Sequence, residues 1–285
     1  MPINAGAVGN LIETYNVDVD VRKCLAYAAG MGETADIYFD DARTGGIVAP
    51  PAYVASLEWP ASRDIRTTTA FGASPEEMRC GVHAAQDTQF HRLIRPGERI
   101  CVSGELVAIR RVTPGALTVT RIDLTTVAGE KVATTYTTGI SRGVDVNGDD
   151  QVIEAAPDWP DDALSGDWTE MAIPIAREMP HVYTECADIW NPIHTERKVA
   201  LAAGLPDIIL HGTATWALAV REIVSKRLGS DPARLARFSG RFTGMVIPGN
   251  DIIVRHSATM KGAAYEVIAA DGSKAISAGR ALFRD

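Results

Sequence analysis

The sequence predicts an α+β protein of two similar halves, each an antiparallel sheet wrapped around one central helix. In the second half, the segment that follows Gly212 is apolar on nearly every face, which is typical of a buried helix. Alternating apolar and polar runs follow it, separated by Pro-Gly and Asp-Gly turns, as in an antiparallel sheet. The first half contains the same succession of motifs, which indicates an internal repeat.

Length and composition are those of an ordinary globular protein. The 285 residues suffice for two domains of about 140 residues, each with its own core. The apolar fraction is 46%, and a net charge of −8 without a basic cluster argues against a nucleic-acid partner. No apolar run is long enough to span a membrane, and the first residues lack the pattern of a signal peptide. We therefore expect a cytoplasmic protein without a membrane partner.

Cysteine spacing indicates neither a zinc site nor a disulfide framework. The four cysteines lack C-x-x-C spacing: Cys24, Cys80, Cys101 and Cys186. No metal ligand set is expected from them.

The first half is expected to begin with two helices. Residues 11–31 have apolar side chains at helical spacing and predict one helix. A shorter central helix is expected over residues 52–59, because Pro60 would end it, and the polar segment 61–88 follows. Since the corresponding helix of the second half is longer, this shorter helix would leave more room inside the first half.

Strands fill the rest of the first half. Residues 98–142 alternate between apolar and polar side chains, which predicts an antiparallel meander. Residues 143–172 hold nine acidic residues and no Lys or Arg, which indicates a linker. The predicted organisation is thus a first domain over 1–142, a linker over 143–172 and a second domain over 173–285.

The strand pattern returns in the second half after Gly229. Four strands are expected, over residues 238–247, 251–261, 263–269 and 274–283. Together with the apolar segment after Gly212 they predict one sheet around one long helix.

A reactive side chain coincides with a helix start at Asn191-Pro192. Proline suits the first helical position, so Asn191 is predicted to cap a helix that ends near Gly204. His194 would lie in the first turn, where unpaired N–H groups and the helix dipole oppose protonation of its ring. We therefore predict a lowered pKa for His194 and a role as general base.

The second helix start is His211-Gly212. The Gly212 N–H lies where no helical carbonyl can use it, and glycine lets a ligand approach the backbone closely. We predict that this N–H binds a substrate oxyanion. His211 is expected to orient the turn or to hydrogen-bond a carbonyl. Asn191 and His211 are thus the candidates for substrate contact, and capping alone would also explain Asn191.

These residues carry a family resemblance. Asn-Pro-Ile-His, an Ala-rich helix, Gly-Leu-Pro, Ile-Ile-Leu-His-Gly and a long apolar helix follow one another between about residues 173 and 283. This order resembles the MaoC-like acyl dehydratases and (R)-specific enoyl-CoA hydratases, and it implies the hotdog fold. The resemblance also implies an aspartate two places before Asn191, where this chain has Ile189.

The catalytic carboxylate must therefore come from another position. Asp188 stands one place before Ile189 and is our candidate, because a one-residue bulge before Pro192 could bring it beside His194. Glu185 and Glu196 are the other nearby carboxylates. The predicted catalytic set is then Asp188, His194 and Gly212.

The first half resembles the degenerate N-terminal domain common in MaoC-like dehydratases, so the whole chain is expected to be a double hotdog. Three of its residues fall on positions of the candidate site: Glu33 on Ile189, Tyr38 on His194 and Pro51 on Gly212. Tyr38 is a poor base near neutral pH, and Pro51 has no N–H for an oxyanion. We expect one active site per chain.

The resemblance implies a hydro-lyase that adds water across the α,β double bond of an acyl thioester, on CoA or an acyl carrier. It implies no metal, flavin or nicotinamide cofactor, and a homodimer or higher homo-oligomer. A bulky or long acyl chain is expected, because the first central helix is short. Two alternatives stay open: a thioesterase, for which Glu222 is the only carboxylate on the long helix, and a non-catalytic thioester-binding subunit, favoured by Ile189.

Overall fold

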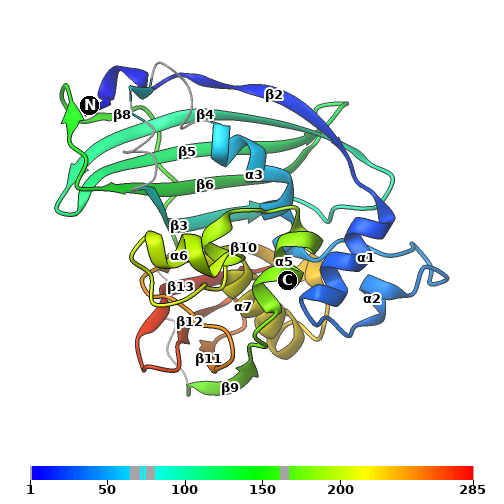
Figure 1. The fold of residues 1–285 in the computed structure, drawn as a ribbon. Coiled ribbons are helices and arrows are strands. Elements are labelled where there is room, and N and C mark those ends of the chain that lie inside the picture. The colour runs from blue at the N-terminus through cyan, green and yellow to red at the C-terminus, as the bar shows by residue number, and fades with distance from the viewer. Residues whose placement is uncertain (1, 65–70, 73, 75–80, 161–166, 285) are drawn as a thin grey trace. The chain divides into compact units, whose positions relative to one another are not determined.

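The chain forms two compact units, each made of three segments. The computed structural model describes residues 2–64, 71, 72, 74, 81–160 and 167–284 (Figure 1). The first unit comprises Met1–Val17, Leu57–His91 and Arg99–Asp162, and the second comprises Asp18–Ser56, Arg92–Glu98 and Ala163–Asp285. The domain division predicted from the sequence, at residues 142 and 172, follows the internal repeat and stays a prediction.

The first unit is an antiparallel sheet with one helix on its face. In spatial order, its strands are β2 (Leu11–Asp18), β4 (Arg99–Val112), β5 (Gly115–Thr126), β6 (Lys131–Arg142) and β3 (Gly81–Phe90). Three short strands complete it: β1 (Ile3–Asn4) pairs with β7 (Val146–Asn147), and β8 (Gln151–Val152) pairs with β4. Helix α3 (Val54–Asp64) crosses the face of β4, β5 and β6 (Figure 1). The predicted meander is therefore confirmed.

The helix predicted over residues 11–31 is wrong in its first part. Leu11–Asp18 is the strand β2, in which Leu11 is 73% exposed and Ile12 only 7% exposed. Helix α1 (Val21–Gly30) begins after Asp20, whose side chain accepts the Lys23 N–H at 3.1 Å. The cap at Asp20 is thus the real start signal, and the apolar residues before it serve a strand.

The first central helix extends beyond the predicted stop. A 3-10 turn, η2 (Pro51–Tyr53), leads into α3, and Pro60 lies inside α3 instead of ending it. Leu57 and Ala61 are buried, so packing against the sheet outweighs the single backbone N–H that Pro60 lacks. The last strand of the unit, β3, occupies part of the predicted polar segment 61–88. Residues 65–70, 73 and 75–80 of that segment lie outside the described residues.

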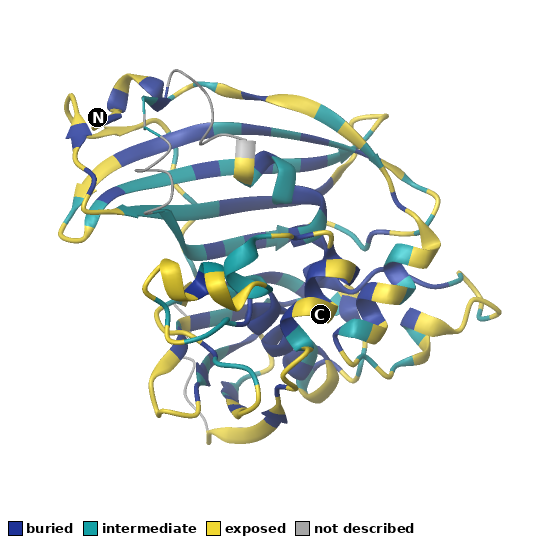
Figure 2. Ribbon diagram, in the orientation of Figure 1, coloured by how far each residue is buried: buried dark blue, intermediate teal, exposed yellow. Residues whose placement is uncertain are grey.

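The second unit wraps a second antiparallel sheet around the helix α7 (Gly212–Arg227). In spatial order, its strands are β10 (Leu235–Phe242), β13 (Lys274–Phe283), β12 (Gly262–Ile268), β11 (Asp251–Ala258) and β9 (Thr169–Pro174). Most of α7 is buried (Figure 2). The Trp216 side chain of α7 is fully buried and meets the Phe238 ring edge-on, with ring centroids 5.5 Å apart. The predicted central helix is confirmed, and the α+β hotdog class with it.

Strand limits differ from the prediction at two places. β10 ends at Phe242, because the chain then leaves the sheet for the turn before Gly249, rather than continuing to residue 247. β9 begins at Thr169, inside the stretch expected to be linker. An edge strand with five exposed residues out of six carries little apolar signal, and this explains why β9 was missed. Within the described ranges, no helix is both long and apolar enough to cross a membrane.

Glu58 is a buried carboxyl between α3 and the first sheet. Its side chain is 3% exposed, and its Oε1 accepts a hydrogen bond from the Thr135 hydroxyl of β6 at 2.6 Å. The Thr135 hydroxyl also lies 2.9 Å from that of Thr88 on β3. Burial raises the pKa of Glu58 to about 8, against which the Thr135 hydrogen bond acts only in part.

We expect Glu58→Gln to be more stable than the wild type near pH 8. The folded carboxyl holds its proton up to about pH 8, whereas the unfolded one releases it near 4.5. The contribution of this group to the free energy of unfolding therefore falls as the pH rises between these values, by at most about 1.4 kcal/mol per pH unit. Urea unfolding from pH 5 to 8 should show a widening gap between the two proteins, with the exposed Glu13→Gln as control. A gap that stays constant with pH would contradict the buried, protonated state.

Candidate active site

The Asn-Pro-Ile-His motif lies in a turn between two short helices of the second unit. Helix α5 (Met179–Ala187) ends at Asp188, and the 3-10 turn η5 (Pro192–His194) follows. Asn191 is extended, and its side-chain oxygen accepts the Ile193 N–H at 3.4 Å. The predicted cap at Asn191 is therefore present.

The helix predicted from Pro192 to Gly204 is interrupted. η5 stops at His194, and α6 (Arg197–Ala202) starts after Glu196, whose φ of −120° and ψ of 99° are extended. Thr195 is a poor helix former and leaves the helical region, so the turn at Pro192 does not propagate. Gly204 adopts the left-handed φ of 79° expected of the residue that ends such a helix.

His194 is held as a neutral ring with one free acceptor. Its Nδ1 lies 2.8 Å from the Ile209 carbonyl oxygen. A carbonyl oxygen only accepts, so Nδ1 carries the proton and Nε2 has a free lone pair. Burial lowers the pKa of His194 to about 4, which the Ile209 hydrogen bond only partly opposes. The predicted lowering is confirmed, although its main cause is loss of solvent and not a helix dipole.

His211 packs its ring directly against that of His194. The ring centroids are 3.7 Å apart with planes inclined by 26°, and His211 is 2% exposed. Its Nε2 donates to the Ile189 carbonyl at 3.2 Å and lies 3.3 Å from the Thr184 hydroxyl. Burial, and secondly the neighbouring His194, hold the pKa of His211 well below its ordinary value. Both stacked rings are therefore neutral at physiological pH.

Gly212 begins α7 immediately after this histidine pair. His211 is the N-cap residue, and the first α7 amide bonded to its carbonyl is that of Thr215, at 3.0 Å. The Gly212 N–H has no hydrogen-bond partner among the described residues. A Cβ at this position would lie 3.1 Å from Phe242 Cδ1, a tight contact that glycine avoids.

The nearby carboxylates lie away from this arrangement. Ile189 is 4% exposed, so an apolar side chain fills the position where the resemblance implies an aspartate. Asp188 has a left-handed φ of 54°, a side chain 64% exposed, and an ion pair with Lys23 Nζ of α1 at 2.6 Å. Glu185 and Glu196 are exposed as well. The structure thus brings His194, His211 and Gly212 together, and leaves Asp188 at the surface.

Two functional contacts escaped sequence reasoning. The Ile209 and Ile189 carbonyls set the tautomers of the two histidines, and a backbone acceptor leaves no side-chain pattern to read. Thr184 might have been found by its place four residues before Asp188 on α5, but threonine at that spacing is common in helices. No group of three or more His, Cys, Asp or Glu side chains among the described residues is arranged to hold a metal ion.

Two sequence families match the chain, one in each half. Residues 168–277 match the family described as MaoC like domain. Residues 6–135 match the family described as FAS1-like, dehydratase domain region. The two matches together cover both sheets.

Named relatives cover different shares of the chain. The 3-hydroxyacyl-thioester dehydratase Y of Mycobacterium tuberculosis is 27% identical over 290 residues, spanning 96% of this chain and 95% of the relative. The enoyl-CoA hydratase ChsH3 of the same organism is 34% identical over 108 residues, spanning 38% of this chain and 34% of that relative. The chain thus matches about a third of ChsH3, but nearly all of the dehydratase.

Solved structures share the fold over the whole chain. The MaoC-like dehydratase from Phytophthora capsici superposes with a TM-score of 0.85 at 18% identity, covering 99% of this chain and 98% of its own. A conserved Mycobacterium tuberculosis protein with a double hotdog fold gives a TM-score of 0.62 at 14% identity, covering 97% of this chain and 96% of its own. These likenesses show the double-hotdog fold, and the two family matches place the MaoC like domain in the second half and the FAS1-like dehydratase domain region in the first.

Proposed function

We propose that this protein is a hydro-lyase that adds or removes water across the α,β double bond of an acyl thioester. The observation that carries the proposal is the Nδ1 hydrogen bond of His194 to the Ile209 carbonyl, which leaves Nε2 as an acceptor. The His194 ring stacks on His211, and Gly212 follows His211 at the start of α7. The relatives named enoyl-CoA hydratase and 3-hydroxyacyl-thioester dehydratase support the substrate class, most simply an acyl-CoA.

In the hydration direction, His194 and Gly212 act on opposite ends of the reacting system. His194 Nε2 accepts a proton from water as its oxygen bonds to the β-carbon, and the Gly212 N–H stabilises the negative charge that develops on the thioester oxygen. The imidazolium then returns one proton to the α-carbon, so that one water is added in total. Dehydration is the same path in reverse.

An assay with crotonyl-CoA and longer enoyl-CoA substrates tests the function directly. Loss of the enoyl absorbance with the thioester intact indicates hydration, release of free thiol indicates a thioesterase, and neither indicates a binding subunit. We further propose a preference for bulky or long acyl chains, a homo-oligomeric state and a cytoplasmic location. An optimum at four carbons would contradict the first, and light scattering of the purified protein tests the second.

His194→Ala should lower kcat by at least about a hundredfold, the range expected when a general base is lost. Because the pKa of His194 is lowered to about 4, the wild-type kcat/KM should rise with pH through that region and stay level from pH 6 to 8 as far as this group is concerned. Steady-state rates and circular dichroism of both proteins check this. A folded variant with near-normal activity would rule His194 out.

Gly212→Pro should remove the oxyanion donor while sparing the helix. Proline suits the first helical position, and His211 already has the φ of −57° and ψ of 137° that a residue before proline adopts. The first half shows such a proline, Pro51, at the start of η2. We expect kcat to fall by about a hundred- to a thousandfold relative to Gly212→Ala, which adds the same Cβ but keeps the N–H. Equal rates in the two variants would exclude the amide as the donor.

The carboxylate we propose is Asp188, supported by its place beside the motif in the chain. It would have to leave Lys23 to reach the substrate, because the ion pair now holds it at the surface. Asp188→Asn should then lower kcat about as much as His194→Ala, and the double variant little further, since groups that act together are not additive. Full activity of Asp188→Asn would show that another group holds the reacting water.

A second candidate is a thioester-binding subunit without activity of its own. The buried Ile189 in the aspartate position and the exposed Asp188 favour it. Binding of crotonyl-CoA by a wild-type protein that neither hydrates nor hydrolyses it would support this function instead.

A further inference from the structure

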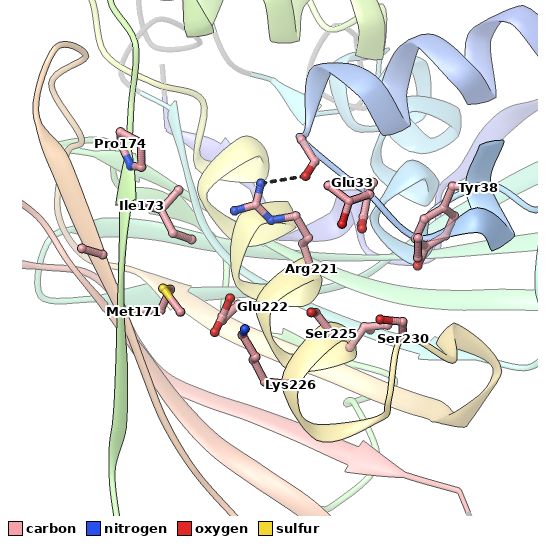
Figure 3. A pocket seen from close by; sticks show the side chains of 15 residues that line it. Glu33, Tyr38, Met171, Ile173, Pro174, Arg221, Glu222, Ser225, Lys226 and Ser230 are labelled. Atoms are coloured by element: carbon pink, nitrogen blue, oxygen red, sulfur yellow. Dashed lines mark hydrogen bonds between the residues drawn. The ribbon is translucent and has the colours of Figure 1, made fainter.

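A cavity lies in the second unit, at the far end of α7 from Gly212. It has a volume of about 280 Å³ and is formed by the loop after α1, helix α2 (Asp36–Phe39), strand β9 and the last turns of α7 (Figure 3). None of His194, His211 and Gly212 lines it. The cavity therefore belongs to a different site from the one described above.

One buried polar atom at this cavity has no partner. Tyr38 is 1% exposed and lines the cavity (Figure 3). The Tyr38 hydroxyl has no hydrogen-bond partner among the described residues. Buried polar groups are nearly always satisfied in folded proteins, so this hydroxyl points to a group that a ligand supplies.

Glu33 adds a carboxyl that changes its charge near neutral pH. Its side chain lies between Arg221 and Tyr38 at the cavity (Figure 3). Burial raises the pKa of Glu33 to about 7, although the Arg221 guanidinium acts in the opposite direction. Arg221 Nη1 donates to the Met31 carbonyl at 2.6 Å, which fixes the guanidinium over this loop. Below pH 7, Glu33 is thus a neutral hydrogen-bond donor.

The other charged groups around the cavity are two cations and one carboxylate. Arg221 and Lys226 line it together with Glu222. Behind Glu222, His256 Nε2 lies 3.9 Å from Oε1, and His256 Nδ1 accepts from Arg227 Nε at 3.0 Å, so the proton of this ring is on Nε2. Asp231 also raises the pKa of Tyr38, but less than burial and Glu33 do. With Glu33 neutral, the lining carries a net positive charge.

We propose that this cavity binds a small carboxylate. The Tyr38 hydroxyl and the protonated Glu33 donate to the ligand carboxylate, and Arg221 and Lys226 supply complementary charge. The volume of about 280 Å³ lies at the lower limit of ligand pockets, so it suits a small ligand.

The internal repeat explains why this is a binding site and not a second active site. Glu33 and Tyr38 are the first-half residues that fall on Ile189 and His194, so a carboxyl and a hydroxyl replace an apolar side chain and a base. The oxyanion donor is also missing from this half, because Pro51 has no N–H. The inference does not rest on the proposed hydration activity.

Calorimetric titration with butyrate and butylamine tests the ligand class. We expect saturable binding of butyrate, because the lining offers hydrogen-bond donors and net positive charge to a carboxylate. Binding should weaken by up to about tenfold from pH 6 to pH 8, because ionised Glu33 repels the ligand carboxylate. Tighter binding of the amine, or no saturable binding of butyrate, would overturn the proposal.

Two variants of the lining and two controls separate the contributions. Tyr38→Phe should weaken binding of butyrate at least about fivefold, whereas Tyr27→Phe, which removes a buried hydroxyl outside the cavity, should not. Glu33→Gln should bind at pH 8 as well as at pH 6, because its amide stays a neutral donor. Equal binding by the two tyrosine variants, or wild-type pH dependence in Glu33→Gln, would refute the assignment. His194→Ala should bind like the wild type, so that failure here leaves the proposed function untouched.

Discussion

The hydrogen bond from His194 Nδ1 to the Ile209 carbonyl is the contact on which the candidate active site depends. It joins the turn after Asn191 to the segment that leads into α7, across 15 residues of chain. It fixes the tautomer, so that Nε2 keeps a free lone pair. Together with the stacking on His211, it holds the ring although the helix is interrupted at Thr195.

Helix α7 serves both ends of the second unit. Its first residue presents an unpaired amide, as the start of any helix does, and its middle is held by the fully buried Trp216. Its last turns bring Arg221 and Glu222 to the cavity that Tyr38 also lines. A helix that is buried nearly all round cannot shift without disturbing the sheet, so the amide at one end and the polar side chains at the other are fixed by the same core.

Periodicity made much of the fold predictable, and tertiary contacts account for what it missed. The apolar segment after Gly212 and the alternating strands are strong local signals, and the histidine motif has a local cap at Asn191. Leu11–Asp18 was mistaken for helix because its short alternation also fits helical spacing, and β9 was missed because it is an exposed edge. The exposure of Asp188 depends on its ion pair with Lys23, 165 residues away, which no local pattern contains.

Replacing an aspartate by Ile189 changes the balance of the chemistry. An anionic carboxylate beside a histidine stabilises the charged ring and raises its pKa. Here an apolar side chain fills that position and the nearest carboxylate is paired with Lys23, so burial acts almost alone and the pKa of His194 falls to about 4. Such a ring is a weak base, but its conjugate acid gives up a proton readily to the α-carbon. The step that must then be helped most is charge development on the thioester oxygen, and stabilisation by a preorganised amide is usually the largest single contribution in such sites. In the proposed mechanism, the Gly212 amide therefore contributes a greater share of the catalysis than in a site with an adjacent aspartate.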